Sequence, residues 1–161
     1  MTNGFKALVL AGSRGGAEPV AEYAQVSHKA LITLQGETLL ARVVAALRAA
    51  GAGEIAVISS HPDVRTEIER LGVTALDEAA GPSLSVQQAA LHLGTPLLVT
   101  TADHALLRPE WVQRFIAETP GDADVAVLMA ARPTVEAAAP GTQRTWLKLA
   151  DGHWSGCNLF W

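Results

Sequence analysis

Short apolar runs alternate along the chain with segments in which apolar residues recur every three or four positions. The runs predict buried strands, which cover residues 5–10, 54–60, 73–76, 96–103 and 122–131. The periodic segments, several of which start near a proline or end at a glycine, predict helices over residues 36–51, 61–72, 83–94 and 108–118. Strands that alternate with helices indicate parallel crossover units. The pattern therefore predicts an α/β fold, a three-layer α/β/α sandwich around a mostly parallel, Rossmann-like sheet.

The pattern changes after residue 131. Residues 132–143 are rich in Pro, Gly and Ala and predict a loop, and residues 144–161 predict two strands around a turn at Asp151-Gly152. The last strand ends on the apolar letters "NLFW", which need further chain to cover them. We therefore expect one domain over residues 1–161 that ends in a hairpin and is incomplete at its C-terminus.

Composition and charge narrow the class of protein. A chain of 161 residues with 49% apolar and 5% aromatic residues can bury the core of one domain. Its net charge of −4, without a block of like charges, gives no support for binding nucleic acid or an anionic membrane. The N-terminus lacks the features of a signal peptide, and no apolar run reaches the roughly 18–20 residues of a membrane span. A single cysteine, Cys157, excludes an internal disulfide and a cysteine zinc cluster, so we expect a cytoplasmic protein.

The first predicted strand leads into a glycine-rich loop, "ALVLAGSRGG" at residues 7–16. Gly12, Gly15 and Gly16 do not have the G-x-G-x-x-G spacing of a dinucleotide-binding loop, and no Gly-Lys-Ser/Thr follows as in a P-loop. The loop still offers backbone N–H groups and the guanidinium of Arg14, which together suit a polyphosphate. From this segment alone, a turn that binds no ligand is an equal alternative.

Other polar residues stand where predicted strands or helices end. Asp103 follows the strand 96–102, and ligands of open α/β sheets bind at the carboxyl ends of the strands. Its carboxylate is the kind of ligand that Mg²⁺ prefers; the alternative is that Asp103 caps the next helix. The imidazole of the neighbouring His104 is a poor ligand for Mg²⁺. Ser83 either caps the helix 83–94 or contacts a base with Gln87 one turn later. Ser59 and Ser60, which end another strand, are expected to border the same cleft.

Two further motifs follow the glycine-rich loop: Lys29 with Leu31, and Gly36 with Leu39 and Leu40. Taken in order, these motifs resemble those of the MobA-like nucleotidyltransferases. This family has a glycosyltransferase-A-like fold, the type of the nucleotide-diphospho-sugar transferases. It is related to the molybdenum-cofactor guanylyl- and cytidylyltransferases and the sugar-nucleotide pyrophosphorylases. The resemblance rests on a Leu-Ala-Gly loop with an Arg, a Lys-x-Leu segment and a Gly-x-x-Leu-Leu helix. Here these are Leu10, Ala11, Gly12 and Arg14; Lys29 and Leu31; and Gly36, Leu39 and Leu40. It extends to "GPSLSVQQAA" at 81–90, "TTADHALLRPEWV" at 100–112 and "TWLKLADGHWSGCNLF" at 145–160.

The resemblance implies a role for each of these residues. Arg14 and Lys29 would stabilise the transition state, and Asp103 with Asn158 would hold Mg²⁺. The nucleotide would bind at Leu10, Ala11, Gly12, Ser13, Gly15, Gly81, Ser83 and Gln87. From the residues alone, Asn158 is equally well a polar interruption of an apolar strand. Residues 15–28 make the loop after Arg14 longer than the family's, and Ala105 stands where a proline is common.

The implied activity is Mg²⁺-dependent transfer of a nucleoside monophosphate from a nucleoside triphosphate to a phosphorylated small molecule, with release of pyrophosphate. A related glycosyltransferase is a second hypothesis, although Asp122-Ala123-Asp124 precedes a predicted strand instead of ending one. A non-catalytic nucleotide-binding module is the third. Trp146, Trp154 and Trp161 either pack in the core or stack on the acceptor. The nucleotide, the acceptor and the oligomeric state stay open.

Overall fold

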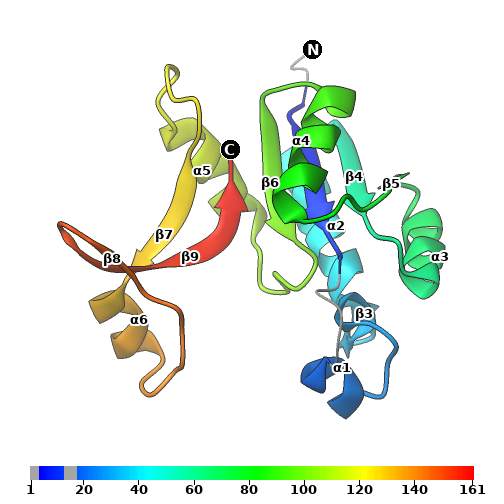
Figure 1. Ribbon diagram of the computed structural model, residues 1–161, viewed down its shortest axis with the longest axis horizontal. Helices are drawn as coiled ribbons and strands as arrows, with labels where there is room; N and C mark the ends of the chain where they lie inside the picture. The colour runs from blue at the N-terminus through cyan, green and yellow to red at the C-terminus, as the bar shows by residue number, and fades with distance from the viewer. Residues whose placement is uncertain (1–3, 13–17) are drawn as a thin grey trace.

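The computed structural model describes residues 4–12 and 18–161 and has at its centre a mostly parallel sheet. The strands lie in the order β5-β4-β1-β6-β9-β7, with β8 paired to β9 (Figure 1). The pairs that β1 makes with β4 and β6, and that β4 makes with β5, are parallel. The strands are β1 (Lys6–Leu10), β4 (Glu54–Ile58), β5 (Thr74–Leu76), β6 (Leu97–Thr101), β7 (Val127–Ala131), β8 (Leu147–Leu149) and β9 (Gly152–Phe160).

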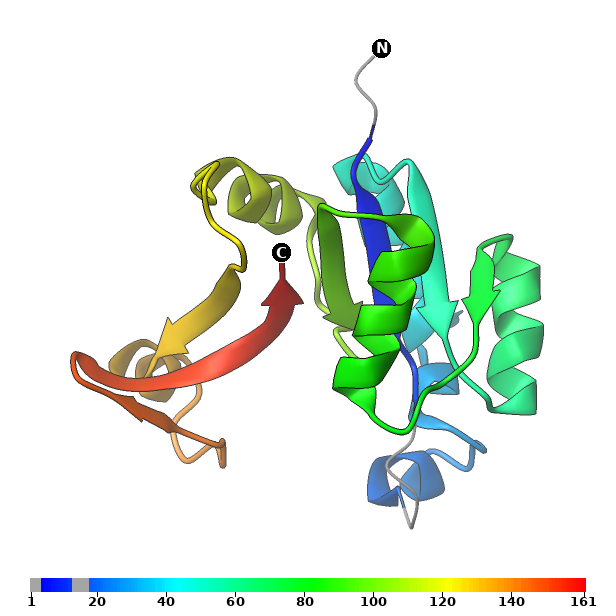
Figure 2. The same ribbon diagram turned by 45° about the horizontal axis from the view of Figure 1, so that its top comes forward.

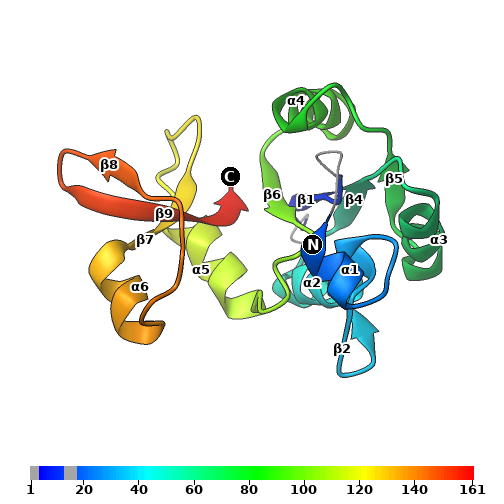
Figure 3. The ribbon, with the colours of Figure 1, turned by 60° about the horizontal axis from the view of Figure 1, so that its bottom comes forward.

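Helices cover both faces of this sheet, so the predicted three-layer α/β/α arrangement is confirmed. Helix α4 lies on one face, and α2 and α5 lie on the other (Figure 3). The helices are α1 (Pro19–Tyr23), the 3₁₀ helix η1 (Lys29–Leu31), α2 (Leu39–Ala50), α3 (Pro62–Leu71), α4 (Pro82–Leu93), α5 (Pro109–Glu118) and α6 (Arg132–Ala138). A separate small hairpin joins β2 (Thr33–Leu34) to β3 (Glu37–Thr38). None of the helices in the described part of the chain is long and apolar enough to span a membrane.

The alternating side chains of β1 show why its sequence is apolar throughout. Val9 packs in the larger core cluster with residues of α2 and α3, whereas Leu8 packs against α4 in the smaller one. Both side chains are completely buried. A strand covered on two faces needs apolar residues at every position. For this reason the apolar run at residues 5–10 correctly predicted β1.

The last strand enters the sheet in a way that the hairpin pattern did not predict. The predicted turn at Asp151-Gly152 is confirmed, and β8 and β9 pair antiparallel across it. Beyond the turn, β9 runs on between β6 and β7 and is antiparallel to both (Figure 2). Opposite β7 its register shifts, so β9 holds extra residues there. Asn158 lies in this bulge with a φ of 52°, and bulges of this kind re-aim side chains.

Two local predictions are wrong. Residues 132–143 were predicted as a loop, but Arg132–Ala138 form α6, because a proline in the first turn is compatible with a helix and alanines favour one. An ion pair between Arg132 and Glu136, 2.6 Å apart, supports that helix. Ser83 was a candidate cap, but the N-cap of α4 is Gly81, with Pro82 in the first turn and no capping side chain.

Thr38 is the N-cap of α2, and its loss is expected to weaken the fold. Its Oγ1 accepts a hydrogen bond from the N–H of Ala41 at 3.0 Å and donates one to the buried carboxylate of Glu67 at 2.6 Å. A Thr38→Ala variant should lose about 1–2 kcal/mol of unfolding free energy, measured by urea denaturation. Thr38→Ser, which keeps the hydroxyl, should retain most of the stability. Equal losses in both variants would show that the cap does not carry the effect.

Candidate functional site

Two pockets meet at the carboxyl ends of the parallel strands. The first, here called the α4 pocket, has a volume of about 380 Å³ and lies between the loop after β1 and the start of α4. The residues lining it are Leu10, Gly12, Lys29, Ile58, Glu78, Ala79, Ala80, Gly81, Pro82, Ser85 and Thr101. The second, the β9 pocket, has a volume of about 640 Å³. The residues lining it are Asp103, His104, Ala105, Leu106, Leu107, Trp111, Leu128, Arg144, Gly156, Cys157, Asn158 and Leu159.

An ion pair joins the two pockets. Nζ of Lys29, on the α4 pocket, lies 3.2 Å from Oδ2 of Asp103, on the β9 pocket, and both side chains are a little over one-third exposed. Burial alone would raise the pKa of the Asp103 carboxyl, but the neighbouring Thr101 hydroxyl and Lys29 outweigh it and hold the pKa below its usual range. The Thr101 hydroxyl makes no hydrogen bond of standard geometry within the described residues, so Lys29 is the firmer contact. Asp103 is thus a carboxylate at neutral pH.

The short helix η1 places Lys29 at this position. Nδ1 of the buried His28 accepts a hydrogen bond from the N–H of Ala30 at 3.1 Å and so caps η1. The N–H of Lys29 itself donates to the Glu18 carboxylate at 3.1 Å. Ala30 is completely buried and packs in the core that α2 also forms, so the backbone around Lys29 is anchored while its side chain reaches the site.

Asp103 and Asn158, the two predicted metal ligands, line the same pocket although one follows β6 and the other lies in β9. The buried hydroxyl of Thr100 donates to the main-chain carbonyl of Asn158 at 2.8 Å and fixes the bulge against β6. Nδ1 of His104 lies 3.2 Å from the same hydroxyl, and burial lowers the pKa of His104 despite the nearby Asp103. His104 is therefore positioned by Thr100, and its expected lack of a metal role stays a prediction.

The donor set at this place fits Mg²⁺. The described ranges contain no group of three or more His, Cys, Asp or Glu side chains that could hold a metal. Mg²⁺ does not require such a group, because it binds one or two protein oxygens and completes its shell with water and substrate phosphates. Asp103 and Asn158 supply oxygens of this kind, and their metal role remains a prediction.

Of the residues predicted to bind the nucleotide, Leu10, Gly12 and Gly81 line the α4 pocket. Ala11 lies beside it, completely buried, with its N–H bonded to the carbonyl of Ile58 at 2.9 Å. Ser13, Arg14 and Gly15 lie outside the described residues, so their predicted contacts with phosphate stay predictions.

Ser83 and Gln87 do not line the α4 pocket, and their predicted contacts with the nucleotide stay predictions. Both are exposed on α4, whereas Ser85 is buried and lines the pocket. The hydroxyl of Ser85 accepts a hydrogen bond from the N–H of Ala79 at 3.0 Å and ties the loop after β5 to the helix. The helical spacing of Ser83 and Gln87 put them on one face, but the sequence did not show that this face points outward.

The sequence analysis also missed Glu78, Arg144 and Trp111. Glu78 comes shortly after a predicted strand, so the strand-end rule that found Asp103 would have found it too. Arg144 lines the β9 pocket and is held by a bond from its Nε to the Ser155 hydroxyl at 2.9 Å, a contact made only in the folded chain. Trp111 lines the same pocket from α5.

The three tryptophans proposed for the acceptor do not line either pocket. Trp161 packs edge-on against Phe5, with ring centroids 6.4 Å apart. Trp146 lies beneath the guanidinium of Arg132, and Nε1 of Trp154 donates to Asp151 at 3.1 Å. These contacts favour the structural alternative. Cys157 also lines the β9 pocket, half-buried, and burial raises the pKa of its thiol.

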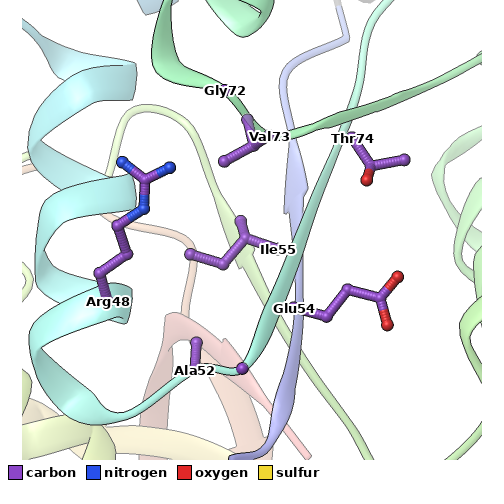
Figure 4. A pocket seen from close by; sticks show the side chains of 8 residues that line it. Arg48, Ala52, Glu54, Ile55, Gly72, Val73 and Thr74 are labelled. Atoms are coloured by element: carbon purple, nitrogen blue, oxygen red, sulfur yellow. The ribbon is translucent and has the colours of Figure 1, made fainter.

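Features at the opposite edge of the sheet are separate from this site. Asp122 and Asp124 precede β7, which runs in the same direction as β6, so they lie at the amino end of the strands. That position disfavours the glycosyltransferase hypothesis, which needs such a pair beside the nucleotide. Another pocket, of about 430 Å³, lies at the amino ends of β4 and β5; the side chains of Arg48, Ile55 and Val73 lie on one side of β4, and those of Glu54 and Thr74 point to its other side (Figure 4). It includes none of the predicted site residues.

The buried His28 should make stability depend on pH. Burial lowers its pKa, with His61 and Lys29 acting in the same direction and Glu18 and Glu78 opposing them. The unfolded chain therefore takes up a proton near pH 6.5 before the folded chain does, and the free energy of unfolding should fall as the pH drops below that value. One such group contributes up to about 1.4 kcal/mol per pH unit.

Urea denaturation between pH 5 and 7 checks this prediction. His28→Asn keeps an acceptor for the N–H of Ala30 but cannot be protonated, so its stability should depend less on pH than that of the parent. His104, whose pKa is also lowered, would supply part of the remaining slope. Equal slopes in the two proteins would contradict the assignment to His28.

Comparisons with known proteins agree with this architecture. The family model described as the MobA-like NTP transferase domain matches residues 7–151. A hypothetical transferase from Thermus thermophilus is similar, with a TM-score of 0.73 and 30% identity. The similarity covers 97% of this chain and 64% of the Thermus chain, so the present chain spans a little less than two-thirds of that protein's length.

Two further solved structures share the fold. A nucleotidyl transferase from Methanothermobacter has a TM-score of 0.70 and 23% identity, and the similarity covers 98% of this chain and 71% of that one. A CMP:2-keto-3-deoxy-manno-octonic acid synthetase in complex with CTP has a TM-score of 0.68 and 17% identity. The similarity covers 97% of this chain and 73% of the synthetase chain. No curated protein matches the sequence.

Proposed function

Because the chain belongs to the MobA-like NTP transferase family, we propose that it forms the nucleotide-binding part of a Mg²⁺-dependent nucleotidyltransferase of the cytoplasm. Its substrates would be a nucleoside triphosphate and a phosphorylated small molecule, and its products a nucleotide-linked molecule and pyrophosphate. The observation that carries the proposal is the ion pair between Lys29 and Asp103, which joins two pockets at the carboxyl edge of the sheet.

The α4 pocket is the proposed place of the nucleoside. Its volume of about 380 Å³ is in the range of small-molecule sites, and its apolar wall of Leu10, Ile58 and Pro82 suits a flat base. Lys29 at its end would then meet the phosphates, because the triphosphate extends from the nucleoside towards Asp103. The β9 pocket, on the other side of Asp103, would take the acceptor, so the two substrates would meet at the ion pair.

Asp103 and Asn158 would hold Mg²⁺ between the pockets. When bound there, Mg²⁺ would supply a Lewis acid that neutralises phosphate charge. The carboxylate of Asp103 is ready for this role, because its lowered pKa keeps it ionised. Lys29 neutralises Asp103 in the structure and, with phosphates present, would stabilise their negative charge.

The proposed chemistry needs positioning more than proton transfer. A phosphate oxygen of the acceptor attacks the α-phosphorus, a new P–O bond forms, and the bond from that phosphorus to the bridging oxygen of pyrophosphate breaks. The attacking phosphate is already ionised at neutral pH, so no general base is required. Lys29 and the predicted contacts of Arg14 would stabilise the charge that spreads over the phosphoryl oxygens.

Thermal unfolding with ATP, GTP, CTP and UTP, each with and without Mg²⁺, tests the proposal. A ligand that binds the folded state at 100 times its Kd adds about 2.7 kcal/mol of stability. We expect a Mg²⁺-dependent rise in Tm with at least one nucleotide, followed by pyrophosphate release when a panel of phosphorylated small molecules is added. Binding without pyrophosphate release would favour a non-catalytic module, and no rise with any nucleotide would refute the proposal.

A further inference from the structure

The buried ring of His28 lies beside the ring of His61, directly before the residue that reaches the site, Lys29. The two ring centroids are 5.4 Å apart and the ring planes are inclined by 52°. We propose that this pair is an acid-sensitive device that displaces Lys29 from Asp103 when His28 takes up a proton. His28 would thus be a positioning residue that acts through Lys29. Its importance for activity rests on the proposed function, in which Lys29 stabilises the charge of the phosphates.

His28 cannot take up a proton and keep its present contact. Its Nδ1 accepts the N–H of Ala30 at 3.1 Å, so the neutral ring carries its hydrogen on Nε2. A further proton can bind only at Nδ1, where it would face the N–H of Ala30. Protonation of the ring and capping of η1 therefore exclude each other.

The surroundings of the two rings offer no partner for an added charge. Nε2 of His28 and Nδ1 of His61 are both buried, and neither has a hydrogen-bond partner among residues 4–12 and 18–161. Most buried polar atoms in proteins have a partner, and a buried cation without one is costly. A charged His28 ring therefore gains free energy by moving towards water or a carboxylate.

The groups around His28 set the pH range in which this happens. Burial lowers its pKa most; Glu18, before α1, opposes burial, whereas His61 and Lys29 lower the pKa further and Glu78, after β5, raises it. The net result is a pKa below the ordinary value of 6.5, so His28 is neutral at pH 7 and the cap of η1 is intact.

The other elements packed against η1 leave this balance in place. Helix α2 shares with Ala30 a core of buried apolar side chains. At the start of α3, the carboxylate of Asp63 accepts a hydrogen bond from the hydroxyl of Ser27 at 2.5 Å. Asp63 thus holds the residue before His28 and not the ring itself.

Lys29 depends on η1 for its position. Within this three-residue helix, the N–H of Leu31 donates to the carbonyl of His28 at 3.0 Å and that of Ile32 to the carbonyl of Lys29 at 3.2 Å. The ion pair with Asp103 adds little, because both side chains are more than one-third exposed. A displacement of about 1 Å at a catalytic group can lower a rate by about 10²-fold, so η1 need not unfold to stop the reaction.

An NMR titration between pH 5 and 8 tests the proposal without any substrate. The His28 ring should carry its hydrogen on Nε2 at pH 8. Below the midpoint of the His28 titration, the N–H groups of Ala30 and Lys29 should lose their protection against hydrogen exchange. His28→Asn keeps an acceptor for Ala30 but binds no proton, so its protection should not depend on pH. His92→Asn, exposed on α4 and away from both pockets, is the matched control and should behave like the parent.

Pyrophosphate release over the same pH range gives the functional readout. Below the His28 midpoint, kcat of the parent should fall about 10-fold per pH unit relative to His28→Asn, the slope of one group that must be unprotonated. The acceptor phosphate also titrates near pH 6, but equally in both proteins. His28→Ala, which lacks the cap, should have a lowered kcat already at pH 8. His61→Gln removes a neighbouring positive charge, so it should move the midpoint to higher pH.

The outcomes separate the role of His28 from the proposed function. If Ala30 stays protected while His28 titrates, or if kcat of His28→Asn falls in acid as steeply as that of the parent, the device does not exist and the nucleotidyltransferase proposal survives. If no pyrophosphate is released by any variant, the proposed function fails and hydrogen exchange alone decides whether His28 controls η1. Equal impairment of His28→Asn and His28→Ala at pH 8, or loss of protection throughout the chain at the His28 midpoint, would show a purely structural role and overturn the proposal.

Discussion

Replacing Asp103 with alanine is expected to abolish the Mg²⁺-dependent rise in Tm with the preferred nucleotide. The same change should lower pyrophosphate release by about 10²–10³-fold, the usual cost of removing one group that stabilises transition-state charge. The reason is the place of Asp103, an ionised carboxylate at the end of β6 that faces the pocket of Asn158 and the ion pair with Lys29.

The fold itself should tolerate this substitution. Both partners of the ion pair are more than one-third exposed, and pairs of that kind contribute less than about 1 kcal/mol to stability. The Tm without ligand should therefore change little, which separates a lost metal ligand from a damaged protein. Glu118→Ala, which breaks an exposed ion pair with Arg114 on α5, is a control that should leave activity intact. Full Mg²⁺-dependent binding by Asp103→Ala would contradict the proposed metal site.

Lys29→Met is expected to have the second largest effect. It keeps the aliphatic part of the side chain but removes the charge that would meet the phosphates. Pyrophosphate release should fall by about 10²-fold or more, mainly in kcat, because the charge on the phosphoryl oxygens is largest in the transition state. Binding of the nucleotide should weaken less than the rate falls. Steady-state kinetics with the preferred nucleotide and acceptor measure both quantities.

Lys29→Arg distinguishes charge from geometry at this position. It restores a cation, but the guanidinium is larger and planar, so we expect partial recovery of the rate. If Lys29→Met retains the parent rate, Lys29 is only a surface partner of Asp103. The ion pair between the two pockets would then play no part in catalysis. A higher rate of pyrophosphate release in Lys29→Arg than in Lys29→Met would support a role for the positive charge of Lys29.

Local sequence was sufficient to predict the order of most strands and helices and the position of one site residue, Asp103. Buried parallel strands such as β1 and β6 are apolar at every position because helices cover both faces, so they stand out as runs. Asp103 could be identified because it directly follows such a run, and the carboxyl ends of these strands meet at one edge. Lys29 was found through family resemblance and not through its local pattern.

Tertiary structure decided which of these residues meet. Nothing in the pattern of β9 shows that it enters the sheet between β6 and β7, since strand pairing depends on which partners are available after the chain has folded. That pairing creates the bulge at Asn158 and the pocket it shares with Asp103. Helical spacing likewise grouped Ser83 with Gln87, but only packing against the sheet showed that Ser85 faces the pocket.

The amino-acid sequence alone was thus enough to predict the layers of the fold and the position of Asp103 at the end of a strand. Both predictions depend on apolar runs and periodicity, which involve residues close together in the sequence. The folded molecule determined the pairing of Lys29 with Asp103 and the place of Glu78 against Gly12. Those contacts join residues from different strands and loops. They depend on distances that only the assembled sheet sets.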